Sequence, residues 1–408
     1  MASAYTDAML SSRLRAVIAV AVAVAVMSTV AACALYDASL LLPAPSASEG
    51  GADGGALEAS ADAAAVVDAG CMHFVAPLPP ATDDAAMGPD RDFVVAASFF
   101  RVVNGGAATH PPSPSGFDLD GVCTCPGPPT CTGTVAKGVC DLDGGADDNG
   151  GVFFAQYAML DPAGFSDMGL STGVVAGSNG LLYRVKGYNG QPNDTKVTVI
   201  AYESSGIHDA DGGPLAPTLD GKDVWSIAPN SLLGGNSVDG GASCEGNDQT
   251  CLPVFFDTNA YVSNGTLVAH IDHPFFIGYQ ISRIRVQLTG SVLVARLLPS
   301  GGGFQVDDGR LSGRWSTTSF LTAAQSLNDP LQPGVGLCGS SVTYQNIKSG
   351  VCTIADVMAE PGKDNTGVAC DAFSMQVAFT AVPAHLGPIA DEGKLRTPCG
   401  PTYEDHCP

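Results

Sequence analysis

The stretch RIRVQLTGSVLVARL, residues 283–297, alternates apolar with polar side chains. Its first half places three aliphatic side chains on one face of an extended strand and polar side chains on the other, beginning with Ile284 opposite Arg283. The Thr-Gly-Ser sequence that follows is typical of a turn, and a second apolar run begins at Val292. The stretch therefore predicts a β-hairpin.

Two further stretches carry the same signal. LLYRVKGYNGQPNDTKVTVIAY, residues 181–202, predicts a second hairpin around the Asn189-Gly190 turn. AFSMQVAFTAV, residues 372–382, predicts a half-buried strand. Helical patterns are fewer, at 315–327, 151–162 and 342–358. The sequence thus predicts a mainly β fold, an antiparallel β-sandwich with a few peripheral helices.

The composition limits the class of partner. The 408 residues carry a formal net charge of −23, and only 14% of them are charged, while 50 are glycine. A chain this acidic repels phosphate backbones and attracts divalent cations, so nucleic acid is excluded as a partner. The glycine content indicates a protein rich in turns and loops.

The amino terminus has the pattern of an export signal. Arg13 and Arg15 precede an apolar stretch over residues 16–30, which is shorter than the ~20 residues that a membrane-spanning helix needs. A basic segment, a short apolar segment and small residues at its end are typical of a cleaved secretory signal peptide. We expect residues 1–32 to be that peptide.

The end of this segment, Val30-Ala31-Ala32-Cys33, resembles the lipobox of bacterial lipoproteins. The resemblance implies that diacylglycerol is attached to the Cys33 thiol, that the chain is cut before it, and that the new amine is acylated, as with palmitate. Ala34 stands where an aspartate is associated with inner-membrane retention, so the resemblance implies the outer membrane. The alternative is an ordinary signal peptide whose Cys33 forms a disulfide.

Composition divides the rest of the chain. Residues 33–70 are dominated by Ala, Asp, Gly, Ser and Pro and are predicted to be a disordered tether, because they bury too little apolar area to fold. A Gly-rich coil of this length spans about 33 Å. Residues 71–408 are predicted to form the ectodomain, with a possible internal boundary near 231–251.

The cysteine count agrees with export. Of 13 cysteines, 12 remain for disulfides once Cys33 carries lipid. Spacing leaves the connectivity open, although short bridges at 244–251 and 399–407 are plausible. The alternative is a zinc site made by four clustered cysteines, which are Cys123, Cys125, Cys131 and Cys140.

Two segments share the tetrapeptide Asp-Leu-Asp-Gly. They are GFDLDGVCTC, residues 116–125, and VCDLDGGADDNGG, residues 139–151, and they resemble the acidic repeats of extracellular calcium-binding modules while departing from the EF-hand. The alternative is a pair of solvated turns, since Asp and Gly are turn formers. The predicted calcium ligands are Asp118, Asp120, Asp141, Asp143, Asp147, Asp148 and Asn149.

Two other motifs are candidates for catalysis. AHIDHPFF, residues 269–276, groups His270, Asp272 and His273, for which a structural His–Asp hydrogen bond is favoured over a metal or catalytic role. GLSTG, residues 169–173, matches the G-x-S-x-G elbow of serine hydrolases through Ser171, but the residues before it do not form the strand which that motif requires.

The chain as a whole resembles bacterial surface lipoproteins of unknown role, with a lipobox, a tether and a cysteine-rich β ectodomain. The resemblance implies a lipid-anchored protein at the cell surface or outer membrane and supplies no catalytic residues. We therefore expect a non-enzymatic binding or structural role, with a glycan or a surface protein as ligand and calcium as a stabilising ion. The alternative is a secreted surface hydrolase acting on glycans or esters.

Overall fold

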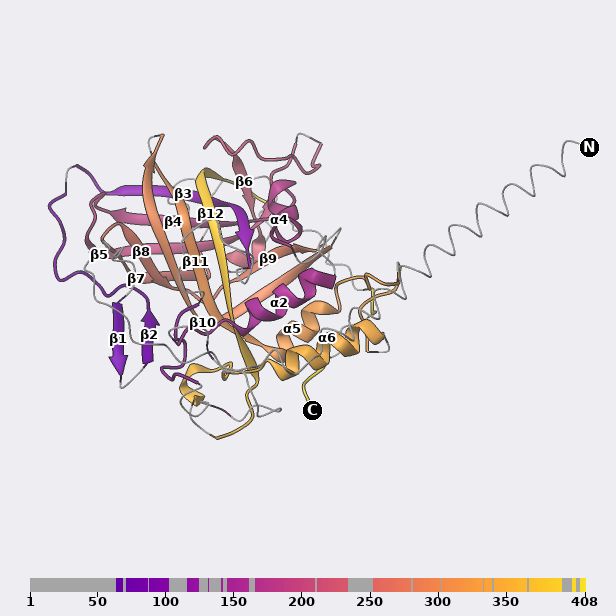
Figure 1. Cartoon of the computed structure of the whole chain (residues 1–408). Coiled ribbons are helices and arrows are strands. Elements are labelled where there is room, and N and C mark those ends of the chain that lie inside the picture. The colour runs from indigo at the N-terminus through magenta and orange to yellow at the C-terminus, as the bar shows by residue number, and fades with distance from the viewer. Residues whose placement is uncertain are drawn as a thin grey trace, which may run out of the picture. The chain divides into compact units, whose positions relative to one another are not determined.

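The structure is a computed structural model of the whole chain (Figure 1). It describes residues 64–68, 71–86, 88–102, 116–124, 131, 141, 145–160, 166–209, 211–233, 252–279, 282–301, 303–332, 334–339, 341–364, 367–390, 398–400 and 404–408. The predicted signal peptide and lipid attachment site at Cys33 lie outside the described residues, as does most of the predicted tether.

Eight antiparallel strands pair side by side until the sheet closes on itself. In sheet order they are β11 Gly303–Ser316, β10 Ser282–Ser300, β8 Thr266–His270, β7 Phe255–Ser263, β5 Asp194–Gly206, β4 Gly180–Tyr188, β3 Arg91–Arg101 and β12 Ala372–Ile389. β12 also pairs with β11, which closes the ring. The mainly β prediction is confirmed, but the sandwich is wrong, because one sheet forms a barrel instead of two sheets packing face to face.

The opening stretch does not form a hairpin. β10 runs through it as one strand of 19 residues, and its pairing with β11 is interrupted between Thr289 and Val292. Gly290 has a φ of 56°, so it supports a β-bulge that bends the strand and does not reverse the chain. The first half of β10 pairs with β9, Pro274–Tyr279, and the second half with β8. The predicted hairpin is therefore wrong, although its strand character and turn glycine are real.

The other predicted elements are present. β4 and β5 form the hairpin expected around Asn189-Gly190, and β12 includes the strand predicted over 372–382. Helices form at all three predicted places, as α2 Asn149–Leu160, α5 Thr317–Ala324 and α6 Val342–Thr353. The caps of α5 and α6 are Ser316 and Ser341, whose hydroxyls accept backbone N–H bonds from Ser319 and Tyr344.

The remaining elements are short. α4 spans Asp167–Val175, and two single-turn helices span Pro229–Ser231 and Pro361–Lys363. β6, Val224–Ile227, pairs with β5 and β12. β1, Ala64–Asp68, and β2, Cys71–Val75, form a separate two-stranded sheet, and β1 falls inside the segment predicted to be tether. No helix among the described ranges is long and apolar enough to span a bilayer.

Within the described part of the chain, three disulfides have both of their cysteines placed, and each includes at least one cysteine of the carboxy-terminal half. They join Cys131 to Cys370, Cys338 to Cys399 and Cys352 to Cys407. The predicted bridge 399–407 is therefore wrong, because each of these cysteines pairs with a residue 55 or 61 positions away. The zinc alternative is wrong as well, since Cys131 and Cys123 are both disulfide-bonded. Cys244 and Cys251 lie outside the described residues.

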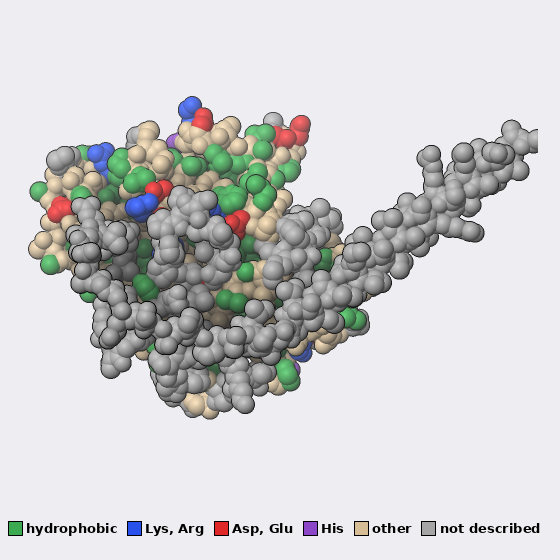
Figure 2. All heavy atoms as spheres, viewed as in Figure 1, with side chains coloured by type: hydrophobic (Ala, Val, Ile, Leu, Met, Phe, Trp, Pro, Cys, Tyr) green, Lys and Arg blue, Asp and Glu red, His purple; other side chains and the backbone are tan. Residues whose placement is uncertain are grey.

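Several basic side chains of the described strands form ion pairs with aspartates. Arg184 pairs with Asp92 at 2.6 Å, and Arg296 pairs with Asp307 at 2.6 Å. In Figure 2 the blue side chains over the upper part of the molecule are scattered, some of them beside red ones, and do not gather into a basic patch. These exposed pairs contribute little stability individually, so the barrel depends on its core.

The core offers a direct test of close packing. The Phe379 ring of β12 lies over Gly309 of β11, and a Cβ at Gly309 meets that ring at 2.6 Å. We therefore expect Gly309→Ala to lower the free energy of unfolding by about 1–3 kcal/mol in chemical denaturation. Gly303→Ala on the same strand is the control, since its Cβ meets only Ser300 O at 3.9 Å. Equal stability of the two variants would contradict this packing.

Candidate metal centre

Two acidic loops lie side by side against β12. Residues Phe117 and Asp147 form an isolated antiparallel bridge, with the Asp147 N–H donating to Phe117 O at 3.1 Å. Gly116 has a φ of 99° and packs so closely on the second loop that a Cβ there meets Asp147 O at 2.4 Å. Its N–H donates to Oε1 of Gln376 on β12 at 2.7 Å. Glycine is required at 116 because only glycine allows both this backbone conformation and this approach.

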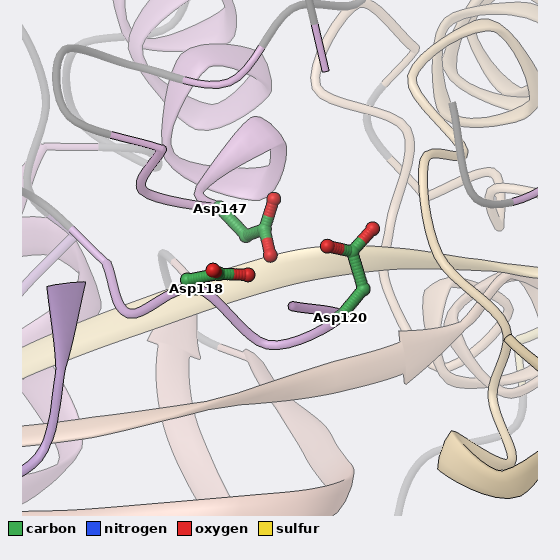
Figure 3. Close-up of side chains that lie close together, drawn as sticks. All are labelled: Asp118, Asp120 and Asp147. Atoms are coloured by element: carbon green, nitrogen blue, oxygen red, sulfur yellow. The ribbon is translucent and has the colours of Figure 1, made fainter. Parts of the chain in front are cut away.

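This arrangement brings three predicted ligands together. Asp118, Asp120 and Asp147 each offer a carboxylate oxygen, and these oxygens lie within 4.8 Å of one another. Figure 3 shows the three carboxylates turned toward a common space, two from the loop that contains residues 118 and 120 and one from the turn before α2. Asp147 is 2% exposed, and the Asp118 side chain is 1% exposed. The cluster is therefore largely removed from solvent.

Backbone and side-chain donors hold each carboxylate. Asp118 contacts Nδ1 of His73 on β2 and accepts the Gly121 N–H at 2.7 Å. Asp147 accepts the Leu119 N–H at 2.7 Å, and Asp120 accepts the Val122 N–H at 2.8 Å. The donors fix the position of the carboxylates.

The electrostatics of the cluster are unfavourable at neutral pH. Burial raises the pKa of Asp147 well above its usual range, and the nearby carboxylates of Asp356, Asp120 and Asp141 raise it further. Burial also raises the pKa of Asp141 to about 6 and that of Asp356 to about 7. The Asp141 side chain is hydrogen bonded to the Asp147 side chain, which requires a shared proton. The cluster thus needs a proton or a cation.

A buried arginine lies beside the first loop without neutralising it. Arg314 on β11 is 1% exposed and donates to Leu119 O, the carbonyl between Asp118 and Asp120. It also donates to Met358 O at 3.2 Å and forms an ion pair with Asp364 at 2.6 Å. Its charge is matched by Asp364, so its role at the cluster is to position the loop backbone.

The other predicted ligands have structural contacts. Asp148 caps α2 by accepting the Gly151 N–H at 3.1 Å, and it accepts the Gln376 N–H at 2.9 Å. The Asn149 amide donates to Asp356 at 2.7 Å. Asp143 lies outside the described residues.

Sequence reasoning missed three participants, which are His73, Asp356 and Arg314. His73 and Asp356 are far from the acidic loops in the chain, and Asp356 is held by Ser374, whose hydroxyl donates to it at 2.5 Å. No local spacing links these residues. The sequence of β12 shows one side of this arrangement, because Ser374 and Gln376 alternate with apolar residues and so form a polar face. In the structure both side chains are buried, so other parts of the chain cover that face.

The two catalytic motifs do not form active sites. Ser171 is fully buried within α4, donates to Phe100 O at 3.0 Å and accepts the Phe100 N–H at 2.9 Å. The AHIDHPFF residues diverge, since Asp272 accepts bonds from Ser291 and His273 contacts the Tyr183 hydroxyl at 2.9 Å. The His270 N–H donates to Asp257. The contacts that position this motif are therefore different from the predicted hydrogen bond between a histidine and an aspartate of the motif.

A small apolar cavity lies among the helices. It has a volume of about 10 Å³ and is lined by residues of α2, α5 and α6, such as Phe153, Phe320 and Ile347. A space of this size holds at most one water molecule, and its apolar walls offer that water no partner. The cavity therefore cannot accept a substrate.

The donor set is that of a hard cation. Carboxylate oxygens are the preferred ligands of calcium and magnesium, and calcium is the larger and less geometrically demanding of the two ions. Comparisons of the chain with protein-family models, curated proteins and solved structures found no match. Function is therefore inferred from this geometry and from the sequence.

The raised pKa values predict how stability varies with pH without divalent cations. The folded protein binds the protons of Asp141, Asp147 and Asp356 more tightly than the unfolded chain does. Their contribution to stability is therefore complete below pH ~4, and the parts due to Asp141 and Asp356 are lost as pH rises through about 6 and about 7. Asp147→Asn removes one of these charges. In chelator at pH 7.5 we expect this variant to be more stable than the native chain by about 1–3 kcal/mol.

The measurement is chemical denaturation of both proteins at pH 4 and at pH 7.5. The increase in the free energy of unfolding caused by Asp147→Asn should be smaller at pH 4, where the native carboxyl is already protonated. A gain that is the same at both pH values, or a loss at pH 7.5, would contradict the electrostatic description of the cluster.

Proposed function

We propose that this chain is a lipid-anchored cell-surface protein with a non-enzymatic binding or structural role, and that calcium stabilises its ectodomain. The observation that carries the calcium part is the convergence of the Asp118, Asp120 and Asp147 carboxylates, with oxygens within 4.8 Å of one another in a site where Asp147 is 2% exposed. Without a cation such a cluster must retain protons at neutral pH, which costs stability.

The position of the cluster suggests what the ion does. The Asp118 N–H donates to Phe74 O of β2 at 2.7 Å, and the Asp118 carboxylate contacts His73 of the same strand. Asp147 lies on the turn that leads into α2, which packs on β12. Calcium bound by these aspartates therefore fastens the two-stranded sheet of β1 and β2 to the wall of the barrel.

The anchor rests on the sequence. Val30-Ala31-Ala32-Cys33 resembles a lipobox, and an Ala, Asp and Gly-rich segment separates it from the first described strand. Several acyl chains on Cys33 hold a protein at a membrane far more firmly than one chain does. The acidic ectodomain then faces the exterior, where free calcium is available to its carboxylates and a glycan or surface protein is the expected ligand.

The alternative is a surface hydrolase acting on glycans or esters. Its serine version fails because the Ser171 hydroxyl is buried and bonded to the backbone of Phe100. A glycosidase needs two carboxyl groups that flank a bound sugar. The acidic cluster instead faces backbone N–H groups and other carboxylates, so the geometry favours the non-enzymatic role.

Calcium binding is tested by thermal unfolding of the full chain at pH 7.5. We expect millimolar calcium to stabilise the native protein relative to chelator, by about 2.7 kcal/mol when calcium is a hundredfold above its dissociation constant. Asp120→Asn removes a ligand charge without removing a backbone contact of the barrel, so we expect it to lose most of this stabilisation.

The control is Asp211→Asn. Asp211 lies on an exposed turn, where its backbone N–H donates to the Asp209 carboxylate. This variant keeps the full calcium effect if the acidic cluster is the binding site. Superimposable melting curves of the native protein in calcium and in chelator would overturn the calcium part, and an equal loss in both variants would place the ion elsewhere.

The anchor is tested separately in a bacterium with an outer membrane. We expect the native chain to incorporate labelled palmitate and to sediment with outer membranes, because the Cys33 thiol and amine carry the acyl chains. Cys33→Ser should abolish both the label and the sedimentation. Asp120→Asn is the control that keeps both. Release of the native protein into the soluble fraction without label would refute the anchor.

A further inference from the structure

A second polar cluster lies where β4 begins and β5 ends, and it shares no residue with the acidic loops. Within the described part of the chain, Asn179 Oδ1, Glu203 Oε2 and Ser205 Oγ are buried and have no hydrogen-bonding partner in the protein. Their residues are 2%, 1% and 4% exposed. A buried polar atom without a partner costs stability comparable to a lost hydrogen bond, so three of them on adjacent segments of the β4–β5 ladder call for a bound molecule.

The strand register places these side chains on one face. Gly180 is the partner of Ser204 and Leu181 is the partner of Glu203 in the β4–β5 ladder. The Ile207 N–H donates to Gly177 O at 2.9 Å, so the same register continues past the end of β4. Asn179 and Ser205 are therefore directly opposite each other, with Glu203 two residues along β5 on the same face.

The charge balance argues against a cation. Glu203 Oε1 is bound by Arg285 of β10 at 2.8 Å, so the carboxylate is already neutralised by one positive charge. The three remaining atoms are two acceptors and one hydroxyl, which can donate. A single water molecule satisfies all three, and three hydrogen bonds is the usual number for a buried water in a protein.

We propose that one ordered water molecule binds here, donating to Asn179 Oδ1 and Glu203 Oε2 and accepting from the Ser205 hydroxyl. The site is closed by α4, because the Asn179 amide lies where a Cβ on Gly173 would be, at 2.1 Å from its nitrogen. The water thus joins the ends of β4 and β5 beneath this helix. It is independent of the calcium proposal, since none of its residues belongs to the acidic cluster.

The first test is a crystal structure of the full chain grown in rubidium chloride. We expect a density peak within hydrogen-bonding distance of all three atoms and no anomalous rubidium signal at that place. An anomalous peak there would replace the water with a monovalent cation. No density, with Ser205 turned to donate directly to Glu203 or Asn179, would overturn the proposal.

A solution measurement needs no crystals. Oxygen-17 relaxation dispersion counts water molecules that stay bound for nanoseconds or longer. Ser205→Ala leaves the water with two partners and speeds its exchange, so we expect the count to fall by about one. Ser204→Ala is the matched control, because Ser204 lies on the opposite face of β5 and its hydroxyl donates to Ser226 O at 2.5 Å. Equal counts in the native protein and Ser205→Ala would overturn the proposal.

Discussion

The pairing of β11 with β12 is the constraint on which the rest of the structure depends. It joins strands that belong to different parts of the chain, with α5, α6 and their connecting loops between them, and it closes the sheet. Closure gives β11 and β12 one face inside the barrel and one face outside. The inner face carries Trp315 opposite Phe373 and Leu311 opposite Val377, all buried in the main core. The outer face is where the acidic loops attach.

The outer face shows how a polar face of a strand becomes buried. Ser312 is opposite Gln376, and Arg314 is opposite Ser374, so polar side chains alternate with the core residues along both strands. These polar groups bind the loops, through Gln376 to Gly116 and through Ser374 to Asp356 and Asn149. Burying polar groups is tolerated when each finds a partner. The carboxylates at the centre of this arrangement are the exception, because their nearest partners include one another.

Much of the fold is readable from local pattern, and the closure is not. The two-residue alternation along β4, β5 and β12, and the serine caps of α5 and α6, depend on neighbours within one segment, and these elements form where expected. The error at residues 283–297 has a physical cause, since a Thr-Gly-Ser sequence suits both a reversal and a bulge. The choice is made by β8 and β9, which supply separate partners for the two halves of β10. The barrel likewise depends on long-range pairing.

The acidic cluster is likewise only partly predictable from local sequence pattern. Asp118, Asp120 and Asp147 were found because repeated acidic turns are a local signal. His73, Asp356 and Arg314 were missed because they reach the loops from positions 45 to 207 residues away, and no spacing encodes that approach.

The two polar clusters solve the same problem in different ways. At Glu203 the buried carboxylate has its own arginine, so the remaining oxygen needs only a neutral donor. At Asp147 the nearby arginine is matched by Asp364, and the surrounding groups include further carboxylates. Burial in both places raises the cost of an uncompensated charge, but only the second leaves negative charge in excess. A neutral molecule is sufficient at the first, whereas the second requires a proton or a cation, and its hard oxygen donors suit a cation such as calcium.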